Sequence, residues 1–285
     1  MNHAARLYRF SKRHAVSSFI FIVLLIGALY TLFPIYMCVL NSLKTEQDMM
    51  NSILSIPAKL ELENYVIAFQ KTNYFRGLLN TVIVVATGLC GIILFSSMAG
   101  YKLSRTKGKL STFLFGLFVM SMLIPFHSIM ITLIKISTNL RVQGSTIGLG
   151  FIYIGLGVPM ALFLYHGFVK SVPLELDEAA QIDGCGEARL FFVIVFPLLR
   201  PITATIAILN ILWMWNDFLL PLLILTDSKS YTILLSTNML FGKYSNNDWT
   251  SLLCTLVMAM LPVTVLYMLM QKYIVKGIAE GALKG

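Results

Sequence analysis

The chain alternates between long apolar stretches and short polar connections along its whole length. Six stretches hold about twenty or more residues, the length a helix needs to cross a hydrocarbon core about 30 Å thick. The pattern predicts an all-α membrane protein with a six-span bundle, and the even count places both termini on one side. Glycines inside these stretches should let helices approach closely or bend locally; examples are Gly88, Gly91, Gly155 and Gly157. The predicted spans cover residues 17–41, 77–100, 111–134, 147–169, 202–226 and 251–271.

The composition excludes a separate soluble domain and argues against a nucleic-acid-binding protein. Of the 285 residues, 57% are hydrophobic and only 12% are charged, with a mean hydropathy of +0.79. Soluble domains carry roughly a quarter charged residues, and apolar stretches recur along the chain, so a separate soluble domain is excluded. The net charge of +9 does not indicate a nucleic-acid partner, because the basic residues lie in short segments between apolar stretches rather than on one face. The predicted surroundings are membrane lipid.

The distribution of Lys and Arg orients the predicted spans. Fourteen of the 22 basic residues fall on the side that holds both termini, and such an excess marks the cytoplasmic side. We therefore expect cytoplasmic tails at residues 1–16 and 272–285. The first apolar stretch is too long for the core of a signal peptide, which has roughly 7–15 residues. No small-residue cleavage site follows it, so we expect this stretch to remain as a span.

The predicted cytoplasmic loop at residues 170–200 breaks this charge bias, since it holds five acids against three bases. A helix is predicted between Pro173 and Gly184, because proline suits a first turn, acids favour a helix N-terminus and glycine favours its end. A second short helix is predicted over about 186–195. One interpretation is an amphipathic helix on the membrane surface, but such helices usually carry bases that anionic lipid attracts. We favour a helix that docks in a cleft of a partner protein.

The run Glu178-Ala-Ala-Gln-Ile-Asp-Gly184, followed by an apolar stretch that reaches Pro197, resembles the EAA loop of ABC-importer permeases. Further segments resemble the carbohydrate-uptake branch of that family, and specifically the shorter permease of maltose-type importers; they are Leu32–Tyr36, Asn41–Lys44, Ala99–Arg105, Trp215–Phe218 and Gln271–Gly277. The resemblance implies an importer-permease bundle in which this cytoplasmic loop forms a coupling helix on an ATPase. By position, the coupling residues are Glu178, Ala179, Ala180, Asp183 and Gly184. Cys185 and Gly186 depart from the family pattern.

The resemblance also implies a function and a set of partners. The chain is expected to form half of the path for a sugar or oligosaccharide in a bacterial or archaeal cell membrane. Its expected partners are two cytoplasmic ATP-binding subunits, a second, non-identical permease and an extracellular sugar-binding protein. No GxxxxGK[ST] phosphate loop occurs, so ATP hydrolysis is expected from a partner and not from this chain. We expect neither cofactor nor metal, because the cysteines lie far apart and neither His127 nor His166 has a second ligand at suitable spacing.

Asp217 is the only charged residue inside the six predicted spans, and a charge at such a depth is a functional hypothesis. One interpretation places it with Trp213 and Asn216 beside a water-filled sugar path. The other has it satisfy backbone groups freed near Pro221, and we favour this structural role. The alternative function is an ATP-independent secondary transporter or channel subunit, but such proteins place several charges in the membrane for ion coupling.

Overall fold

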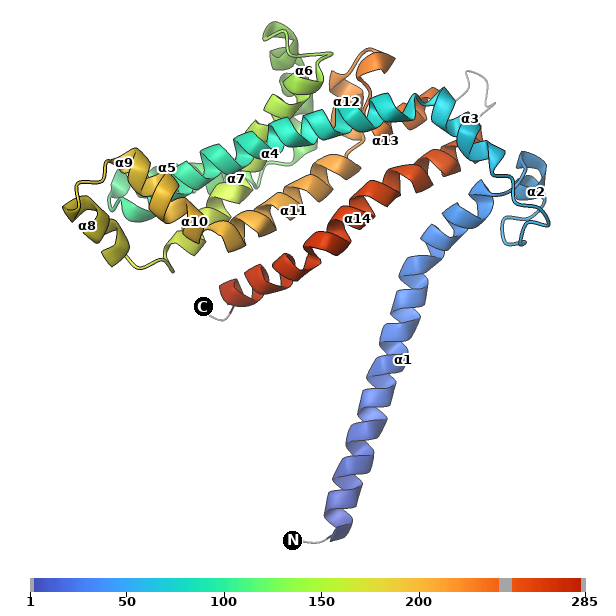
Figure 1. Cartoon of the computed structure of the whole chain (residues 1–285), viewed down its shortest axis with the longest axis horizontal. Helices are drawn as coiled ribbons and strands as arrows, with labels where there is room; N and C mark the ends of the chain where they lie inside the picture. The colour runs from blue at the N-terminus through green and yellow to red at the C-terminus, as the bar shows by residue number, and fades with distance from the viewer. Residues whose placement is uncertain (1–2, 241–247, 283–285) are drawn as a thin grey trace.

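The computed structural model describes residues 3–240 and 248–282, with side chains for residues 16–240 and 248–271. All regular elements in the described part are helical. Figure 1 shows a bundle of long helices, from which the first helix leans away. The long helices are α1 (His3–Ser42), α4 (Tyr74–Arg105), α7 (Thr146–Val169), α11 (Arg200–Asn216) and α14 (Trp249–Ala282). The shorter elements are α2 (Glu46–Asn51), α3 (Glu63–Lys71), α5 (Lys109–Ser121), α6 (Phe126–Asn139), α8 (Glu175–Ile182), α9 (Glu187–Arg189), the π-helix η1 (Leu190–Val195), α10 (Phe196–Leu198), α12 (Leu219–Ile224), η2 (Ser228–Ser230), α13 (Ile233–Ser236) and η3 (Thr237–Leu240).

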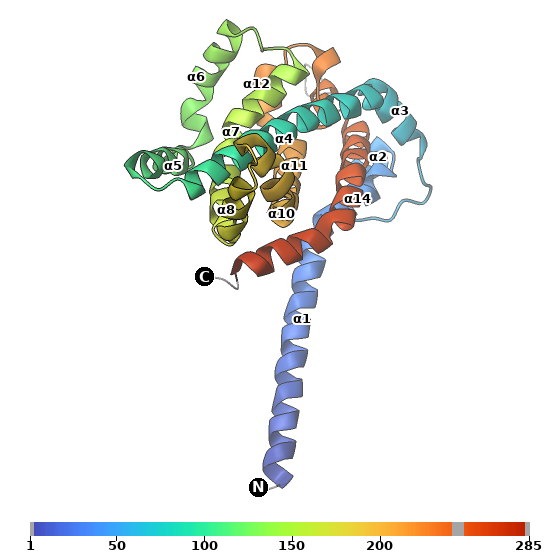
Figure 2. The ribbon, with the colours of Figure 1, turned by 60° about the vertical axis from the view of Figure 1, so that its left-hand side comes forward.

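Four described helices are long and apolar enough to cross a membrane: α1, α4, α7 and α14. The count reaches six only when two bent pairs are each taken as one span. In the predicted third span, 111–134, α5 and α6 meet at 100° instead of forming one straight helix, and Figure 2 shows this pair on one flank of the bundle. The second pair joins the 187–198 segment to α11 at 76°. The predicted six spans and the cytoplasmic position of both tails stay predictions.

Prolines account for the positions of two helix breaks. A proline has no N–H for the carbonyl four residues earlier, and its ring collides with that carbonyl. Counting back from Pro125 gives Ser121, the last residue of α5. Counting back from Pro221 gives Asp217, which directly follows the end of α11 inside the predicted fifth span. Pro159 lies inside α7, which continues past it, so proline alone does not dictate a break.

The most extensive packing in the fold joins α4 to α7. Glycines let the two backbones approach closely. A Cβ added at Gly150 would lie 3.3 Å from the backbone nitrogen of Gly88. A Cβ added at Gly88, Gly91 or Gly157 would collide with side chains of neighbouring helices, which confirms close approach there, whereas nothing lies within 4 Å of one added at Gly155.

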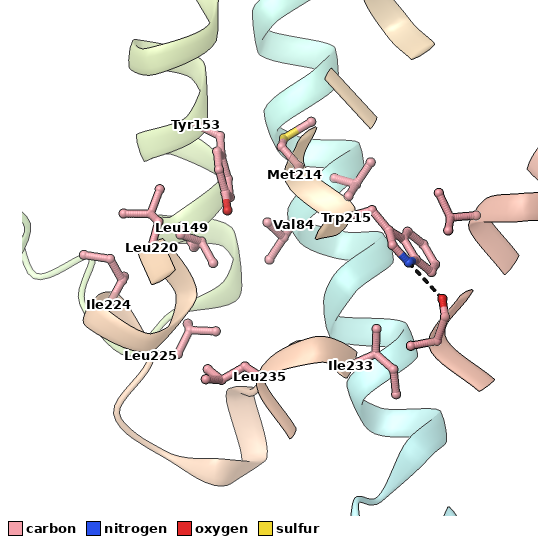
Figure 3. Packing of buried hydrophobic residues seen from close by; sticks show 13 residues of the cluster. Val84, Leu149, Tyr153, Met214, Trp215, Leu220, Ile224, Leu225, Ile233 and Leu235 are labelled. Carbon is pink, nitrogen blue, oxygen red and sulfur yellow. Dashed lines mark hydrogen bonds between the residues drawn. The ribbon is translucent and has the colours of Figure 1, made fainter. Parts of the chain in front are cut away.

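Buried apolar side chains form two clusters along the bundle. The first, shown in Figure 3, gathers around Trp215, whose Nε1 donates a hydrogen bond to the carbonyl of Ala259 at 3.1 Å. Tyr153 and Leu220 belong to this cluster, so it joins α7 to α12 as well as α11 to α14. The second cluster includes Tyr165 and brings the 170–200 loop against α7 and α11.

A fully buried lysine holds the connection between α1 and α3. Lys44 Nζ donates hydrogen bonds to Asn41 Oδ1 at 2.9 Å and to the carbonyls of Ser52 at 2.9 Å and Ile53 at 3.0 Å. The amide of Asn64 donates in turn to the Lys44 carbonyl at 2.8 Å. All three hydrogens of the ammonium group therefore have an oxygen partner, which a buried cation requires.

Candidate functional site

The candidate coupling site is α8 with the loop around it. The helix runs from Glu175 to Ile182, which confirms the helix predicted between Pro173 and Gly184. Gly184 follows it with a φ of +76°, a conformation that glycine adopts at little cost. Acids in the first turn interact favourably with the positive end of the helix dipole. Figure 1 shows α8 at one extreme end of the bundle, beside α9.

The second predicted helix of the loop, over about 186–195, is longer than expected. A short α9 leads into the π-helix η1, and the helical path continues through Pro197 to Leu198. Within η1, Leu190 and Phe191 are buried and form part of the second apolar cluster. The segment therefore serves as a packing base for α8 as well as a connection to α11.

α8 rests on the bundle through its small residues. Ala180 is buried in the second apolar cluster, where Val172 and Phe191 also lie. Its carbonyl accepts the backbone N–H of Cys185 at 2.9 Å, which closes the turn after α8. The other predicted coupling residues are exposed; they are Glu178, Ala179, Asp183 and Gly184. Ile182, which the sequence did not single out, is 86% exposed at the end of the same helix.

The same buried face of α8 is also tied to the end of α4 by polar contacts. Asp177 Oδ2 accepts hydrogen bonds from Arg105 Nε at 2.7 Å and from the Tyr101 hydroxyl at 3.1 Å. Arg105 Nη2 also donates to the carbonyl of Val172 at 3.0 Å. Although Tyr101 and Arg105 lie in a segment that carries the family resemblance, no role was predicted for them. The signal available in the sequence was their four-residue spacing, which places both on one helix face.

A hollow of about 820 Å³ lies between α8 and the end of α4. Glu178 and Gln181 line it from α8, while Lys102 lines it from α4 and Phe192 from η1. The lining combines charged groups with aromatic carbon, so the hollow suits a protein surface with both kinds of side chain. Glu178 is thus presented in a concave and accessible place.

Asp217 lies in the break between α11 and α12. Its Oδ1 accepts the backbone N–H groups of Leu219 at 3.0 Å and Leu220 at 3.3 Å, and its Oδ2 accepts the Tyr153 hydroxyl at 2.8 Å. Tyr153 is fully buried, and its contact with Asp217 was not predicted. The carboxylate therefore supplies acceptors to groups that the break and the apolar cluster would otherwise leave unpaired.

The three predicted path-lining residues share a second hollow, of about 660 Å³. Trp213, Asn216 and Asp217 line it from one side, and the break between α5 and α6 lines it with Ser121 and Phe126. The Trp213 ring meets the Tyr153 ring edge-on, with centroids 5.2 Å apart. Asn216 Nδ2 donates to the Leu212 carbonyl at 2.8 Å. An aromatic face and polar groups thus border one open space.

The histidines that the sequence singled out lie in aromatic surroundings. The His166 ring stacks on Phe115 with centroids 3.9 Å apart, and His127 meets Phe126 at 5.9 Å. No group of three or more His, Cys, Asp and Glu side chains that would hold a metal ion occurs in the described part of the chain. Ring packing is the role that these contacts support.

Comparisons with known proteins agree on one family. Residues 91–280 match the family described as "Binding-protein-dependent transport system inner membrane component". The chain is 39% identical over 251 residues to the probable starch degradation products transport system permease protein AmyC of Thermoanaerobacterium thermosulfurigenes, covering 88% of this chain and 91% of AmyC. It is 36% identical over 253 residues to the melibiose/raffinose/stachyose import permease protein MelC of Bacillus subtilis, covering 88% and 91%. A crystal structure of a bacterial ABC transporter involved in alginate import has a chain that matches with a TM-score of 0.77 at 18% identity, covering 96% of this chain and 98% of that one.

Proposed function

Since this chain belongs to the family of binding-protein-dependent transport system inner membrane components, we propose that it forms half of the path for a sugar or oligosaccharide in an ATP-driven importer. Relatives named for starch degradation products and for melibiose, raffinose and stachyose support this class of cargo. The chain is a membrane-embedded transport subunit. ATP hydrolysis belongs to separate subunits, and energy reaches the path through α8.

The exposure of α8 at the end of the bundle is the observation that carries the coupling role. The helix is held by its buried Ala180, while Glu178 is exposed and Ile182 is 86% exposed. Leu174 and Leu176 are exposed as well, and several exposed apolar side chains close together are typical of a contact surface. A groove with an apolar centre and a basic rim is the complementary partner surface, which we assign to the ATP-binding subunit.

The proposed complex contains two ATP-binding subunits, a second, non-identical permease and an extracellular sugar-binding protein. The apolar part of α1, from Val16 to Ser42, supports the presence of a second permease. None of its most apolar window is buried within this chain, and Figure 1 shows α1 leaning away from the bundle. Such a helix is free to contact lipid on one side and another permease on the other. We place the complex in a bacterial or archaeal cell membrane with both tails cytoplasmic.

Within the path, we assign different roles to the three residues at the second hollow. Trp213 is 40% exposed, and its ring suits contact with the face of a sugar. Asn216 is also exposed beside the same hollow. Asp217 is a scaffold residue, because its carboxylate already accepts three hydrogen bonds from this chain.

Glu178→Lys tests the coupling role in proteoliposomes that contain the ATP-binding subunits, the second permease and the sugar-binding protein. We expect normal membrane insertion but loss of sugar uptake, since the new cation would meet the basic rim of the groove. Glu46→Lys, which also replaces an exposed acid but lies in α2, is the matched control and should transport normally. Unchanged uptake with Glu178→Lys would refute the assignment. Uptake driven by an ion gradient without ATP would favour the alternative of a secondary transporter or channel subunit.

A further inference from the structure

One face of α8 attaches it to the rest of the chain through an apolar and a polar contact. Ala180 packs in the apolar cluster that includes residues of α7, η1 and α11. Three residues earlier on the same face, Asp177 binds Arg105 and Tyr101 of α4. Arg105 also reaches the carbonyl of Val172, which precedes α8. One side chain at the end of α4 thus contacts both the helix and the segment that leads into it.

The Arg105–Asp177 ion pair is buried, so its formation carries a large desolvation penalty. The Asp177 side chain is only 4% exposed and that of Arg105 16%. The second carboxylate oxygen, Oδ1, is buried without a hydrogen-bond partner in the described part of the chain. Removing charges from water offsets much of the attraction inside a protein, so a buried pair is weak evidence for added stability. The fixed planar shape of the guanidinium group instead favours one orientation of its partners.

A second ion pair connects the same two regions but differs in burial. Lys102 Nζ lies 2.9 Å from Glu187 Oε1, and the two side chains are 61% and 86% exposed. Exposed pairs of flexible side chains fix little and contribute little. The Lys102–Glu187 pair is therefore a natural control for the Arg105–Asp177 pair. The two pairs match in charge and location but differ in burial and hydrogen-bond geometry.

We propose that Arg105, Asp177 and Tyr101 are positioning residues that carry the movement of α8 into α4. With the buried pair intact, a displacement of α8 by the ATP-binding subunit moves the end of α4 with it. Without the pair, the loop flexes on its apolar contact while α4 stays behind. Because α4 packs tightly along α7, displacement of one helix is transmitted to the other. This inference rests on the proposed docking of α8 and adds the route by which docking reaches the spans.

The test is the number of sugar molecules taken up per ATP hydrolysed, measured in proteoliposomes of the whole complex. Asp177→Asn and Arg105→Gln should each lower this ratio about tenfold, because each leaves the other partner buried and unpaired. Combining the two substitutions should lower it no further than either alone, since both remove one interaction. Glu187→Gln should change the ratio by less than about twofold. Arg105→Lys keeps the charge but not the planar fork, and it should fall between these results.

Co-purification of the ATP-binding subunits separates coupling from assembly. The inference requires that the variants retain these subunits while the ratio falls. If Asp177→Asn does not assemble, Tyr101→Phe carries the test, because it removes one donor and leaves the ion pair; its ratio must fall below that of Glu187→Gln. A ratio unchanged in Asp177→Asn, or losses that multiply in the double variant, would overturn the link. If Glu178→Lys uncouples uptake while these variants do not, the link fails and the docking role stands; if Glu178→Lys also has no effect, the docking role itself fails.

Discussion

Replacing Gly150 by alanine should loosen the contact between α4 and α7. An added Cβ would stand 2.7 Å from Thr87 Cβ and 3.3 Å from the backbone nitrogen of Gly88. Neither atom can turn away by a change of side-chain rotamer, because a Cβ position is fixed by its own backbone. Relief of the collision therefore requires the two helices to move apart.

The magnitude follows from a comparison with Gly167→Ala on the same helix. Nothing lies within 4 Å of a Cβ added at Gly167, so this variant has no collision. Both substitutions share the gain in helix preference, about 0.5–1 kcal/mol, and the gain cancels in the difference. Overpacking costs about 1–3 kcal/mol. Gly150→Ala should thus have the lower free energy of unfolding by that amount, roughly a 5- to 150-fold change in the folded-to-unfolded ratio.

The assay is unfolding of the purified variants in mixed micelles titrated with sodium dodecyl sulfate and followed by circular dichroism. Equal free energies of unfolding for Gly150→Ala and Gly167→Ala, whether both unchanged or both lowered, would refute the close contact. A selective loss at Gly150 would instead show that the approach of the two backbones stabilises the bundle.

Three further predictions concern charged groups. Asp217→Ala removes the acceptor for two backbone N–H groups and leaves the buried Tyr153 hydroxyl unpaired, at a cost of about 2–4 kcal/mol in unfolding free energy. Uptake of every sugar should fall alike, whereas a changed preference among sugars would contradict the scaffold role. Lys44→Met leaves three oxygens without their donor and should cost about 2–4 kcal/mol, with faster proteolysis before α3 as the check. Burial raises the pKa of Asp248, but hydrogen bonds, led by that from Lys71 Nζ at 2.6 Å, outweigh burial and place this pKa below its ordinary value of 3.8. Above pH 3.8 the wild type should exceed Asp248→Asn in free energy of unfolding by a constant amount, and this difference should shrink to zero as the pH falls through the lower pKa of the folded state. A difference that grows in acid would refute this.

Hydropathy predicted where helices lie but not where they bend. The predicted spans at 77–100 and 147–169 fall within α4 and α7, because a long apolar run in lipid must satisfy its backbone groups within one helix. Between Ser121 and Phe126 the sequence stays largely apolar while the chain turns through 100°. Hydropathy measures preference for lipid and is the same on both sides of such a turn. Only Pro125 signalled the break, and Pro159 shows that a proline can also lie in a helix that continues.

The candidate site was predictable where its signals are local. A helix between Pro173 and Gly184 follows from acids in the first turn and a glycine after the last. The contact between Arg105 and Asp177 joins positions 72 residues apart in the chain, and that between Tyr153 and Asp217 joins positions 64 apart. Counting charges to orient the spans treats Arg105 only as one base on the cytoplasmic side. Which base meets which acid depends on the packing of α4 against α8, which a one-dimensional pattern does not contain.

The contacts of Asp217 also bear on how energy enters the transporter. A secondary transporter needs a membrane carboxylate that exchanges its partners with a proton or ion during the cycle. Oδ1 of Asp217 is occupied by two backbone N–H groups of the break, and Oδ2 by the hydroxyl of a fully buried tyrosine. Releasing this carboxylate would leave those donors unpaired, so it is poorly suited to such exchange. Exposed acids at α8, in contrast, are available to a partner in the aqueous phase, and this difference favours entry of energy through α8.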